Sequence, residues 1–347
     1  MLTRTIKAFF SFSYWFVSSV RILLFKYKLK KQYVFSPFVV SIGNLSFGGA
    51  GKTPMVEYVS SFLSSIEVNH SIVSRGYKRA GKGKIVVSDK TAVLSSCSES
   101  GDEPFLLAHS LPGVPVVVGN KLKTIPLAAH QFASDLVIID DGFQSLNVVR
   151  DLDIVLIDLS LKIKDYRLFP FGSLREPISA IRRAHVVVFT KKNFSVGDAQ
   201  KIKSRILPFI DLRRSLVLDA NYLLYLKKYI KKTSRFISFS QKISSSVVAF
   251  CGIANPKIFI ESLSSFCAEA PVVKIFSDHH NYNKNDICLI KQLLLTNNSS
   301  TIITTKKDFF KIKNLFKGCS LFIIDVKHEI KESSSFHSYL QKKIISS

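Results

Sequence analysis

The segment Ser46–Thr53, with the sequence SFGGAGKT, limits the possible folds of this chain more than any other segment. It follows an apolar run, Phe38–Ile42, that is typical of a buried strand, and it precedes Met55–Leu63, whose apolar spacing predicts a helix. Glycines between a strand and a helix let backbone N–H groups turn toward an anion, and the helix N-terminus adds a positive dipole end. The pattern therefore predicts a loop that binds nucleotide phosphates.

The residues of this loop have separate expected roles. Lys52 should reach the outer phosphates, and the Thr53 hydroxyl should ligate Mg²⁺. The usual pattern begins with glycine where this chain has Ser46, so a glycine-rich turn without a ligand is the alternative. The Gly-Lys-Thr ending between a strand and a helix favours nucleotide binding. The residues that we expect to contact the nucleotide are Ser46, Phe47, Gly48, Gly49, Ala50, Gly51, Lys52 and Thr53.

A second strong pattern lies at residues 135–144, where apolar residues lead into Asp140 and Asp141. A buried parallel strand that ends in aspartate delivers a carboxylate to the carboxyl edge of its sheet. In phosphate-loop enzymes such a carboxylate holds Mg²⁺. An ordinary Asp-Asp-Gly turn is the alternative. The presence of Lys52 and Thr53 in the same chain favours the metal-binding interpretation.

Short apolar runs alternate with helical patterns along most of the chain. One of the helical patterns is amphipathic and extends from about Lys121 to Phe132. Such alternation predicts an α/β fold with a mostly parallel sheet flanked by helices. The chain has 347 residues, 47% of them hydrophobic, which suffices for two lobes.

Residues 1–33 begin with basic residues, continue with an aromatic-rich run from Ala8 to Val20, and end in lysines. The run is short for a spanning helix, which needs about 20 apolar residues. We expect a helix that lies in a membrane interface, with its aromatic face toward the lipid. A packed core helix and a signal or spanning segment are the alternatives.

The formal net charge of +24 raises the question of a nucleic-acid partner. The basic residues are dispersed, and the sequence contains no recognisable nucleic-acid-binding module, so we expect no nucleic-acid partner. An anionic membrane surface or a phosphorylated substrate is favoured over nucleic acid. A general over-use of Lys, Ile, Phe and Ser along the chain is the alternative. The five cysteines form no CxxC pair, which is typical of reduced thiols in the cytosol.

Taken together, the motifs resemble those of the tetraacyldisaccharide 4′-kinase family, the lipid A 4′-kinases. The matching motifs follow the family order: Gly43-Asn44, Gly48–Pro54, Ser74–Tyr77, Gly101–Pro104, Asp140–Gln144, Leu174–Pro177, Asp278-His279 and Thr305–Asp308. The chain departs from the family pattern at Ser145, where histidine is common, and near Asn120-Lys121, where arginine is common.

The resemblance implies a lipid kinase that transfers the γ-phosphate of ATP, with Mg²⁺, to the 4′-hydroxyl of a tetraacylated glucosamine disaccharide 1-phosphate. It implies a phosphate-loop NTPase-like fold with two lobes. The expected segments are a membrane-associated piece at 1–33, a kinase lobe at 34–150, and a second α/β lobe at 151–347 whose C-terminal part can return to the first. The expected location is the cytoplasmic face of the bacterial inner membrane, and the expected state is a monomer.

The resemblance also implies roles for individual residues. Asp102, paired with His279, looks like the base that takes the sugar-hydroxyl proton, although Asp102 and Glu103 could instead cap a helix. The other residues with implied roles are Lys52, Asp140 and Asp141 in catalysis, Thr53, Glu103, Asp141 and Glu176 around the metal, and Arg75, Tyr77 and Arg175 toward the substrate.

A different class of protein shares part of the pattern. Partitioning-type ATPases, which switch on membranes or DNA, carry a similar glycine-rich loop. They usually have a second lysine just before the paired glycines, where this chain has Phe47. Such a switch would also have no task for Asp102 and His279, so this interpretation is the alternative and not the preferred one.

Overall fold

The computed structural model describes residues 2–191 and 198–345, which form two compact units. Unit 1 consists of Met1–Tyr222 and His328–Ser347, and unit 2 of Leu223–Lys327. These bounds differ from the segments 34–150 and 151–347 expected from the sequence. The reason is that the strands after residue 151 continue the sheet that carries the phosphate loop.

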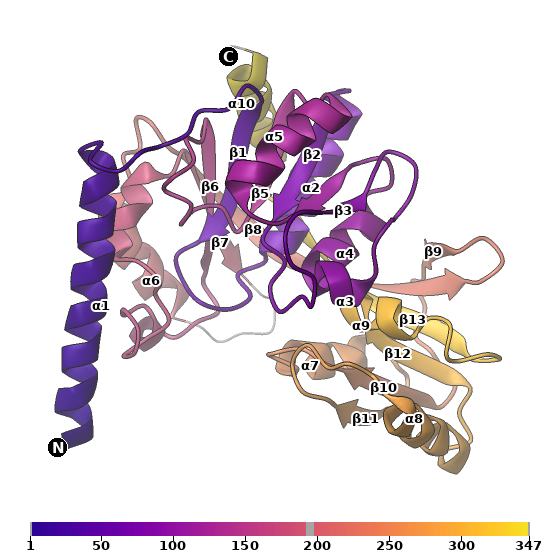
Figure 1. Ribbon diagram of the computed structural model, residues 1–347. Coiled ribbons are helices and arrows are strands. Elements are labelled where there is room, and N and C mark those ends of the chain that lie inside the picture. The colour runs from indigo at the N-terminus through magenta and orange to yellow at the C-terminus, as the bar shows by residue number, and fades with distance from the viewer. Residues whose placement is uncertain (1, 192–197, 346–347) are drawn as a thin grey trace. The chain divides into compact units, whose positions relative to one another are not determined.

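The sheet of unit 1 is parallel except at one edge, where β3 runs antiparallel to β4. In spatial order its strands are β8 (Leu216–Ile230, which continues into unit 2), β7 (Val186–Lys191), β6 (Leu152–Asp158), β1 (Phe38–Asn44), β5 (Leu136–Asp140), β2 (His70–Ser74), β4 (Val116–Val118) and β3 (Ile85–Ser88). β1 pairs with β5 on one side and β6 on the other, so the loops after these strands lie at the same edge (Figure 1).

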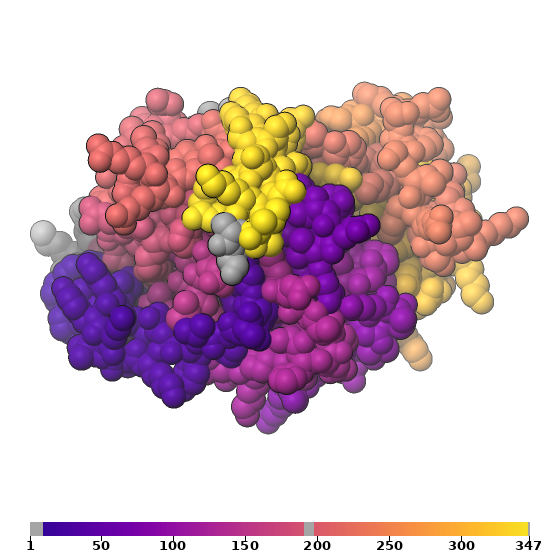
Figure 2. Space-filling view, turned by 90° about the horizontal axis from the view of Figure 1, so that it is seen from above, coloured from indigo at the N-terminus to yellow at the C-terminus, as the bar shows by residue number. Residues whose placement is uncertain are grey.

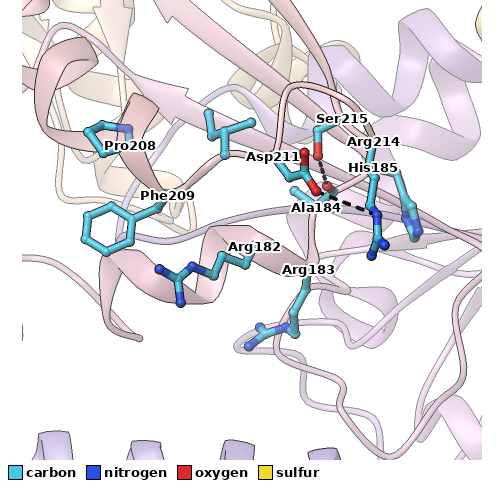
Figure 3. Close-up of a pocket in the computed structure, with 10 residues that line it drawn as sticks. Arg182, Arg183, Ala184, His185, Pro208, Phe209, Asp211, Arg214 and Ser215 are labelled. Atoms are coloured by element: carbon cyan, nitrogen blue, oxygen red, sulfur yellow. Dashed lines mark hydrogen bonds and ion pairs between the residues drawn. The ribbon is translucent and has the colours of Figure 1, made fainter.

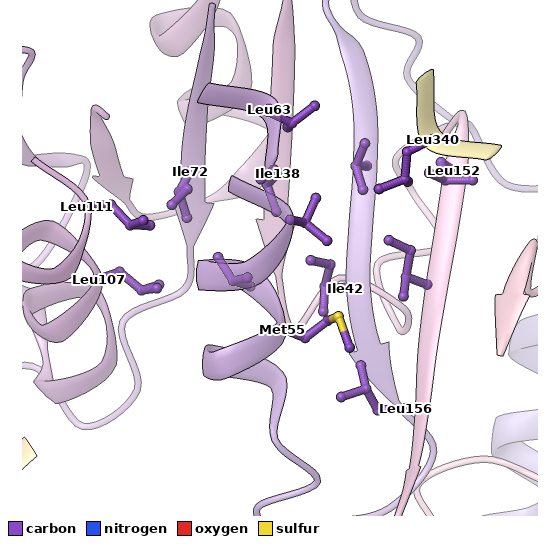
Figure 4. Close-up of a cluster of buried hydrophobic side chains, with 14 of the residues drawn as sticks. Ile42, Met55, Leu63, Ile72, Leu107, Leu111, Ile138, Leu152, Leu156 and Leu340 are labelled. Atoms are coloured by element: carbon purple, nitrogen blue, oxygen red, sulfur yellow. The ribbon is translucent and has the colours of Figure 1, made fainter. Parts of the chain in front are cut away.

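Helices cover both faces of this sheet, as the alternation of buried side chains along its strands requires. On one face, Val40 and Ile42 of β1 pack beneath three helices (Figure 4): α2 (Lys52–Ser65), α4 (Asp102–Ser110) and α10 (Ser333–Ile345). On the other face, Val39 packs against α5 (Lys121–Phe132). Further helical segments of unit 1 are α1 (Leu2–Lys26), α3 (Cys97–Ser100), η1 (Ile163–Asp165), η2 (Ile178–Arg183), α6 (Ala199–Ile206) and η3 (Leu207–Phe209).

α10 brings the end of the chain back to unit 1. Phe336 and Leu340 are fully buried in the core beneath α2. The ring of Phe336 stacks on Tyr58 of α2 at 6.1 Å, and His337 stacks on Phe62 at 4.1 Å. Figure 2 shows α10 in yellow at the surface beside the violet residues of α2. The last helix is therefore an integral part of the unit that carries the phosphate loop.

Unit 2 has its own helices, and its strands β10 to β13 pair in parallel as a continuation of the same sheet. The strands are β11 (Val272–Ile275), β10 (Val247–Cys251), β12 (Thr301–Thr305) and β13 (Ser320–Ile330), followed by the unit 2 part of β8, with β9 (Arg235–Ser238) antiparallel to β8. The helices are α7 (Lys257–Phe266), α8 (Lys284–Thr296) and α9 (Lys306–Ile312). The chain passes from one unit to the other within two long strands, β8 and β13.

The predicted fold class, a mostly parallel sheet flanked by helices, is confirmed. The N-terminal segment forms the helix α1, drawn in indigo in Figures 1 and 2, and its place at a membrane interface stays a prediction. Among residues 2–191 and 198–345, no helix combines the length and the apolar character that crossing a bilayer requires.

Candidate active site

The phosphate loop leaves β1 and enters α2 through two left-handed glycines. Gly48 has a φ of 102°, and Gly51, the N-cap of α2, has a φ of 85°. L-residues with a side chain rarely adopt such angles, which explains the glycines. The start of the loop is held by a distant segment, because the Phe47 N–H donates to the Ser173 carbonyl at 2.6 Å. The loop conformation is thus supported from outside as well as by its own residues.

Lys52 lies where the phosphate-loop pattern predicts it. Its Nζ is 3.3 Å from Oδ1 of Asn44 and 3.6 Å from Oδ1 of Asp141. Asn44 in turn donates from Nδ2 to the Ser46 carbonyl at 2.8 Å. The ammonium group is therefore held over the loop by the strand that precedes it, in the place from which it can reach phosphate oxygens.

Asp140 is the last residue of β5 and is fully buried. The Ser74 hydroxyl donates to its Oδ2 at 3.2 Å, and its Oδ1 has no hydrogen-bond partner among the residues that the structure describes. Burial, assisted by the charges of Glu103 and Asp141, raises the pKa of Asp140 to about 7. A buried carboxylate with an unpartnered oxygen is stabilised in its charged form by a nearby cation.

Asp141 lies one residue further along and has different surroundings. Its backbone is left-handed, with a φ of 52°, and turns the carboxylate toward Arg175. Nη1 of Arg175 donates to both carboxylate oxygens, at 3.0 and 2.8 Å. Burial alone would raise the pKa of Asp141, but the charges of Lys52 and Arg175 outweigh it and lower that pKa. Asp141 is therefore the permanently charged member of the pair.

Arg175 links this site to the N-terminal helix. Its guanidinium group lies over the Phe47 ring at 5.1 Å, and its backbone N–H donates to the Leu45 carbonyl at 2.7 Å. Its own carbonyl accepts a hydrogen bond from the Tyr14 hydroxyl of α1 at 2.9 Å. One residue thus contacts the phosphate loop, Asp141 and α1.

The donors of this site fit Mg²⁺, which prefers oxygen ligands and in kinases is usually held by one or two carboxylates together with phosphates and water. Within the part of the chain that the structure describes, no three His, Cys, Asp or Glu side chains converge as a metal site made of protein alone requires. Asp140 has the unpartnered oxygen that a cation would satisfy. Glu176, also predicted as a ligand, is buried and accepts a hydrogen bond from Nη2 of Arg183 at 2.6 Å.

Asp102 and Glu103 form the first turn of α4, and Glu103 is near enough to raise the pKa of Asp140. The Cys97 thiol donates to Oδ1 of Asp102 at 3.2 Å. Arg75 and Tyr77 follow β2 and are exposed, with Tyr77 65% exposed. The predicted substrate-binding side chains of this turn therefore face solvent.

His279 belongs to unit 2, in the turn after β11, and has a left-handed backbone with a φ of 61°. Its Nε2 lies 3.7 Å from Oδ2 of Asp278, whose Oδ1 lies 3.7 Å from Nζ of Lys307. The His279 ring therefore lies beside the Asp278 carboxylate. Asp102 belongs to unit 1, and the pairing of Asp102 with His279 stays a prediction.

Lys121 and Ser145, which the motifs did not predict as site residues, lie at the site. Nζ of Lys121 donates to the Asp141 carbonyl and to the Ser145 hydroxyl, both at 2.7 Å. Burial lowers the pKa of Lys121 to about 8. The two departures from the family pattern thus meet at the site. The available signal was the position of Lys121, which follows β4 at the carboxyl edge that also carries Lys52 and Asp140.

A separate cavity of about 500 Å³ lies in unit 1 (Figure 3). It contains an ion pair of Arg214 with Asp211 at 3.6 Å, and Arg182 lies over the Phe209 ring at 5.5 Å. No predicted site residue lines it. The cavity is therefore distinct from the candidate active site.

Comparison with known proteins decides the family. A model of the tetraacyldisaccharide-1-P 4′-kinase family matches residues 3–345. The chain belongs to this family. The family predicted from the sequence motifs and the activity class, a kinase, are confirmed.

Individual relatives agree with this assignment. The tetraacyldisaccharide 4′-kinase of Halothermothrix orenii is 32% identical over 341 residues, covering 93% of this chain and 88% of the relative. That of Desulfotalea psychrophila is 33% identical and covers 88% and 87%. The crystal structure of an "apo" form of LpxK from Aquifex aeolicus in complex with ATP has a TM-score of 0.77 and 28% identity, and covers 99% of this chain and all of that one.

Proposed function

We propose that this chain transfers the γ-phosphate of ATP to the 4′-hydroxyl of a tetraacyldisaccharide 1-phosphate, a step of lipid A biosynthesis. The observation that carries the proposal is the convergence of Lys52, Arg175 and the aspartates Asp140 and Asp141 on the phosphate loop. Phosphoryl transfer consists mainly of positioning and charge neutralisation, which is what such a cluster provides.

ATP is the phosphate donor, in keeping with the loop of this chain and with the nucleotide in the related structure. Lys52 and the backbone N–H groups of the loop bind its phosphates. When bound, Mg²⁺ neutralises charge on the β- and γ-phosphates. The residues that would hold it are Thr53, Asp140 and Asp141, with Glu103 next to Asp140. Glu176 is the further proposed metal residue, and Arg183 donates a hydrogen bond to its carboxylate.

Asp102 is the proposed base for the acceptor. It takes the proton of the 4′-hydroxyl while that oxygen forms a bond to the γ-phosphorus and the bond from phosphorus to the ADP oxygen breaks. His279 is proposed to tune Asp102, and Asp278 orients His279. We propose that the sugar or its phosphate is bound by Arg75, Tyr77 and Arg175. Arg75 and Tyr77 are exposed and follow β2, at the edge of the sheet where the phosphate loop follows β1.

We place the enzyme, as a monomer, at the cytoplasmic face of the inner membrane, attached through α1. The support is the distribution of side chains on this helix. Phe12 and Phe16 are 62% and 56% exposed, and Trp15 is 42% exposed, whereas Tyr14 and Ser18 turn toward the protein and donate to the Arg175 carbonyl. A helix that is fixed through the hydroxyl groups of one face and exposes aromatic rings on the other is suited to a lipid surface.

The test is phosphate transfer from γ-labelled ATP to a tetraacyldisaccharide 1-phosphate in detergent micelles with Mg²⁺. We expect a labelled bis-phosphate product with the wild type, and its loss by at least about a hundredfold in Asp102→Ala and Lys52→Ala. The matched controls are Asp135→Ala for Asp102 and Lys123→Ala for Lys52. Each removes an exposed residue with the charge of the residue it is compared with, and each should leave the rate unchanged. ATP hydrolysis without labelled lipid would instead indicate a switch ATPase.

Membrane attachment is tested separately by deleting residues 1–25. We expect the truncated protein to lose flotation with anionic vesicles more than it loses ATP binding. Flotation equal to that of the wild type would reject the role of α1 in attachment.

A further inference from the structure

We propose that Tyr222 and His328 are positioning residues of the kinase, which hold the Gly51 turn of the phosphate loop in its ATP-binding conformation. Neither residue belongs to a motif that identifies the family. Both lie in unit 1, Tyr222 in β8 and His328 in β13, and both are next to Gly51 of the loop. The inference rests on the proposed function only in that the loop binds ATP.

The first contact is a hydrogen bond to the loop backbone. Nε2 of His328 lies 2.9 Å from the Gly51 carbonyl oxygen, so this nitrogen carries the proton and donates it. The same carbonyl accepts the first helical bond of α2, from the Met55 N–H at 3.2 Å. Two donors therefore fix the plane of the Gly51–Lys52 peptide, and with it the direction of the Lys52 N–H.

The second contact is steric. A side chain on Gly51 would collide with the Tyr222 hydroxyl and approach Nε2 of His328 to 2.9 Å. The Tyr222 and His328 rings stack at 4.9 Å between centroids, and both residues are buried. The turn therefore rests directly on two stacked rings, which prevent it from moving into the interior of unit 1.

The ring of His328 is kept neutral by its surroundings. Burial lowers the pKa of His328 to about 4, although the bond to Gly51 acts in the opposite direction. Its Nδ1 is buried and has no partner among the described residues. His328 is therefore a fixed single donor across the physiological pH range, and its one donated hydrogen bond goes to the phosphate loop.

Tyr222 and His328 lie at the two points where the chain passes between the units. Tyr222 in β8 is the last residue of unit 1 before the chain enters unit 2, and His328 in β13 is the first residue after it returns. Both passages of the chain between the units thus stack on each other beneath Gly51. A displacement of either strand at these residues is transmitted to the turn that precedes Lys52.

The experiment compares His328→Leu, which removes the donor, with His328→Gln, whose amide nitrogen can replace Nε2. ATP affinity is measured by calorimetry without lipid, and kcat and KM are measured in the transfer reaction. We expect His328→Leu to weaken ATP binding and raise the KM for ATP about 3- to 10-fold, the effect of one lost hydrogen bond. The KM for the lipid should not change, and His328→Gln should restore ATP binding to within about twofold of the wild type.

His70→Leu is the matched control, because His70 is also a buried histidine of unit 1 and bonds Ser60 at 2.7 Å, away from the loop. It should lower thermal stability as His328→Leu does, without changing ATP affinity. Equal losses of ATP affinity in His328→Leu and His70→Leu would overturn the proposal, as would wild-type affinity in His328→Leu.

Amide hydrogen exchange provides a readout that does not depend on turnover. We expect faster exchange of the amides of residues 48–53 in His328→Leu and unchanged exchange in β1. If His328→Leu does not fold, Tyr222→Phe decides in its place, because it removes only the hydroxyl beneath Gly51. Unchanged loop exchange together with unchanged ATP affinity in Tyr222→Phe would then overturn the proposal. Because ATP binding is measured without lipid, a wrong acceptor assignment would not affect this result.

Discussion

Asp140 and Asp141 are consecutive aspartates whose carboxyl groups have different surroundings and therefore different pKa values. Asp140 ends a buried strand, so its carboxylate lacks solvent and keeps an unpartnered oxygen. Asp141 has a left-handed backbone and lies between Lys52 and Arg175. Burial raises the pKa of the first carboxyl group, and the two cations lower the pKa of the second. Among the described residues, Asp140 therefore keeps a free oxygen that a cation can satisfy, whereas Asp141 is held in its charged form by Lys52 and Arg175.

The raised pKa of Asp140 predicts that Mg²⁺ binding depends on pH. A proton and Mg²⁺ compete for the same carboxylate, whose pKa is about 7. As the pH falls below that value, we expect the Mg²⁺ affinity of the ATP-bound enzyme to drop by up to about tenfold per pH unit. Calorimetric Mg²⁺ titrations between about pH 6 and about pH 8 measure this. Asp140→Asn should bind Mg²⁺ weakly and without this pH dependence.

The same group affects stability with a defined sign. The folded-state pKa of Asp140 lies above its unfolded value, so its contribution to stability is present at low pH and is lost as the pH rises through about 7. Without Mg²⁺, Asp140→Asn should therefore become more stable relative to the wild type as the pH rises from 3.8, the ordinary pKa of the carboxyl group, to about 7. A constant difference in urea denaturation at all pH values would contradict the assigned burial effect. Asp135→Asn, at an exposed position, is the control.

The burial of Lys121 predicts that the free energy of unfolding rises with pH, which is opposite to the trend expected for Asp140. Burial lowers the pKa of Lys121 from 10.5 to about 8, so the folded state binds fewer protons than the unfolded state between these values. The free energy of unfolding of the wild type should rise across this range relative to Lys121→Met, by on the order of 3 kcal/mol. Urea denaturation at several pH values measures the difference. The exposed Lys123→Met should show no such trend.

At the scale of single elements, α1 and the segment around Arg175 form one functional assembly. The Ser173 carbonyl holds Phe47, Arg175 holds Asp141, and Tyr14 and Ser18 of α1 hold the Arg175 carbonyl. The helix therefore has an inner face that supports the site. Its outer face carries exposed aromatic residues that do not belong to a hydrophobic core.

The outer face of α1 predicts membrane affinity that can be removed without unfolding. Replacing Phe12, Trp15 and Phe16 by serine should weaken binding to anionic vesicles by at least about tenfold, because each aromatic ring loses apolar contact with lipid. Thermal stability should change little, since these side chains are 42% to 62% exposed. Vesicle co-sedimentation measures binding. Ile237→Ser, an exposed apolar residue of β9, is the control.

At the scale of the whole molecule, unit 1 is built from two distant parts of the chain. Residues 328–347 return to it after unit 2, and α10 closes the core over β1 and α2. The unit that binds the nucleotide is thus incomplete until the C-terminal helix has been synthesised. This arrangement places the two passages between units at the phosphate loop, at Tyr222 and His328.

Phe336→Ala tests this organisation. Phe336 is fully buried against Tyr58, so truncation should destabilise unit 1 by about 3–5 kcal/mol. We expect native-state hydrogen exchange to accelerate in β1 and β5 and to stay slow in β10 and β12. ATP should restore part of the lost protection in unit 1, because ligand binding stabilises the folded state. Equal acceleration in both units would indicate a single cooperative unit instead.

Much of the fold and of the site could be predicted from local patterns. The predicted helix from about Lys121 to Phe132 is confirmed as α5, and the strand that delivers Asp140 is confirmed as β5. Hydrophobic period, glycine placement and the residue at a strand end are local properties, and they are visible within about ten residues. For the same reason, the phosphate loop and the family are recognisable from short motifs of the amino-acid sequence.

The contacts that complete the site join residues far apart in the chain. Tyr14 and Arg175 are separated by 161 residues, and Gly51 and His328 by 277. Lys121 meets Ser145 because β4 and β5 flank β2 in the sheet, which the order of residues in the chain does not reveal. Motifs in the sequence thus indicate which residues bind phosphate. The order of strands in the sheet determines which lysine, arginine and histidine surround them, because strand ends that are distant in sequence meet at one edge.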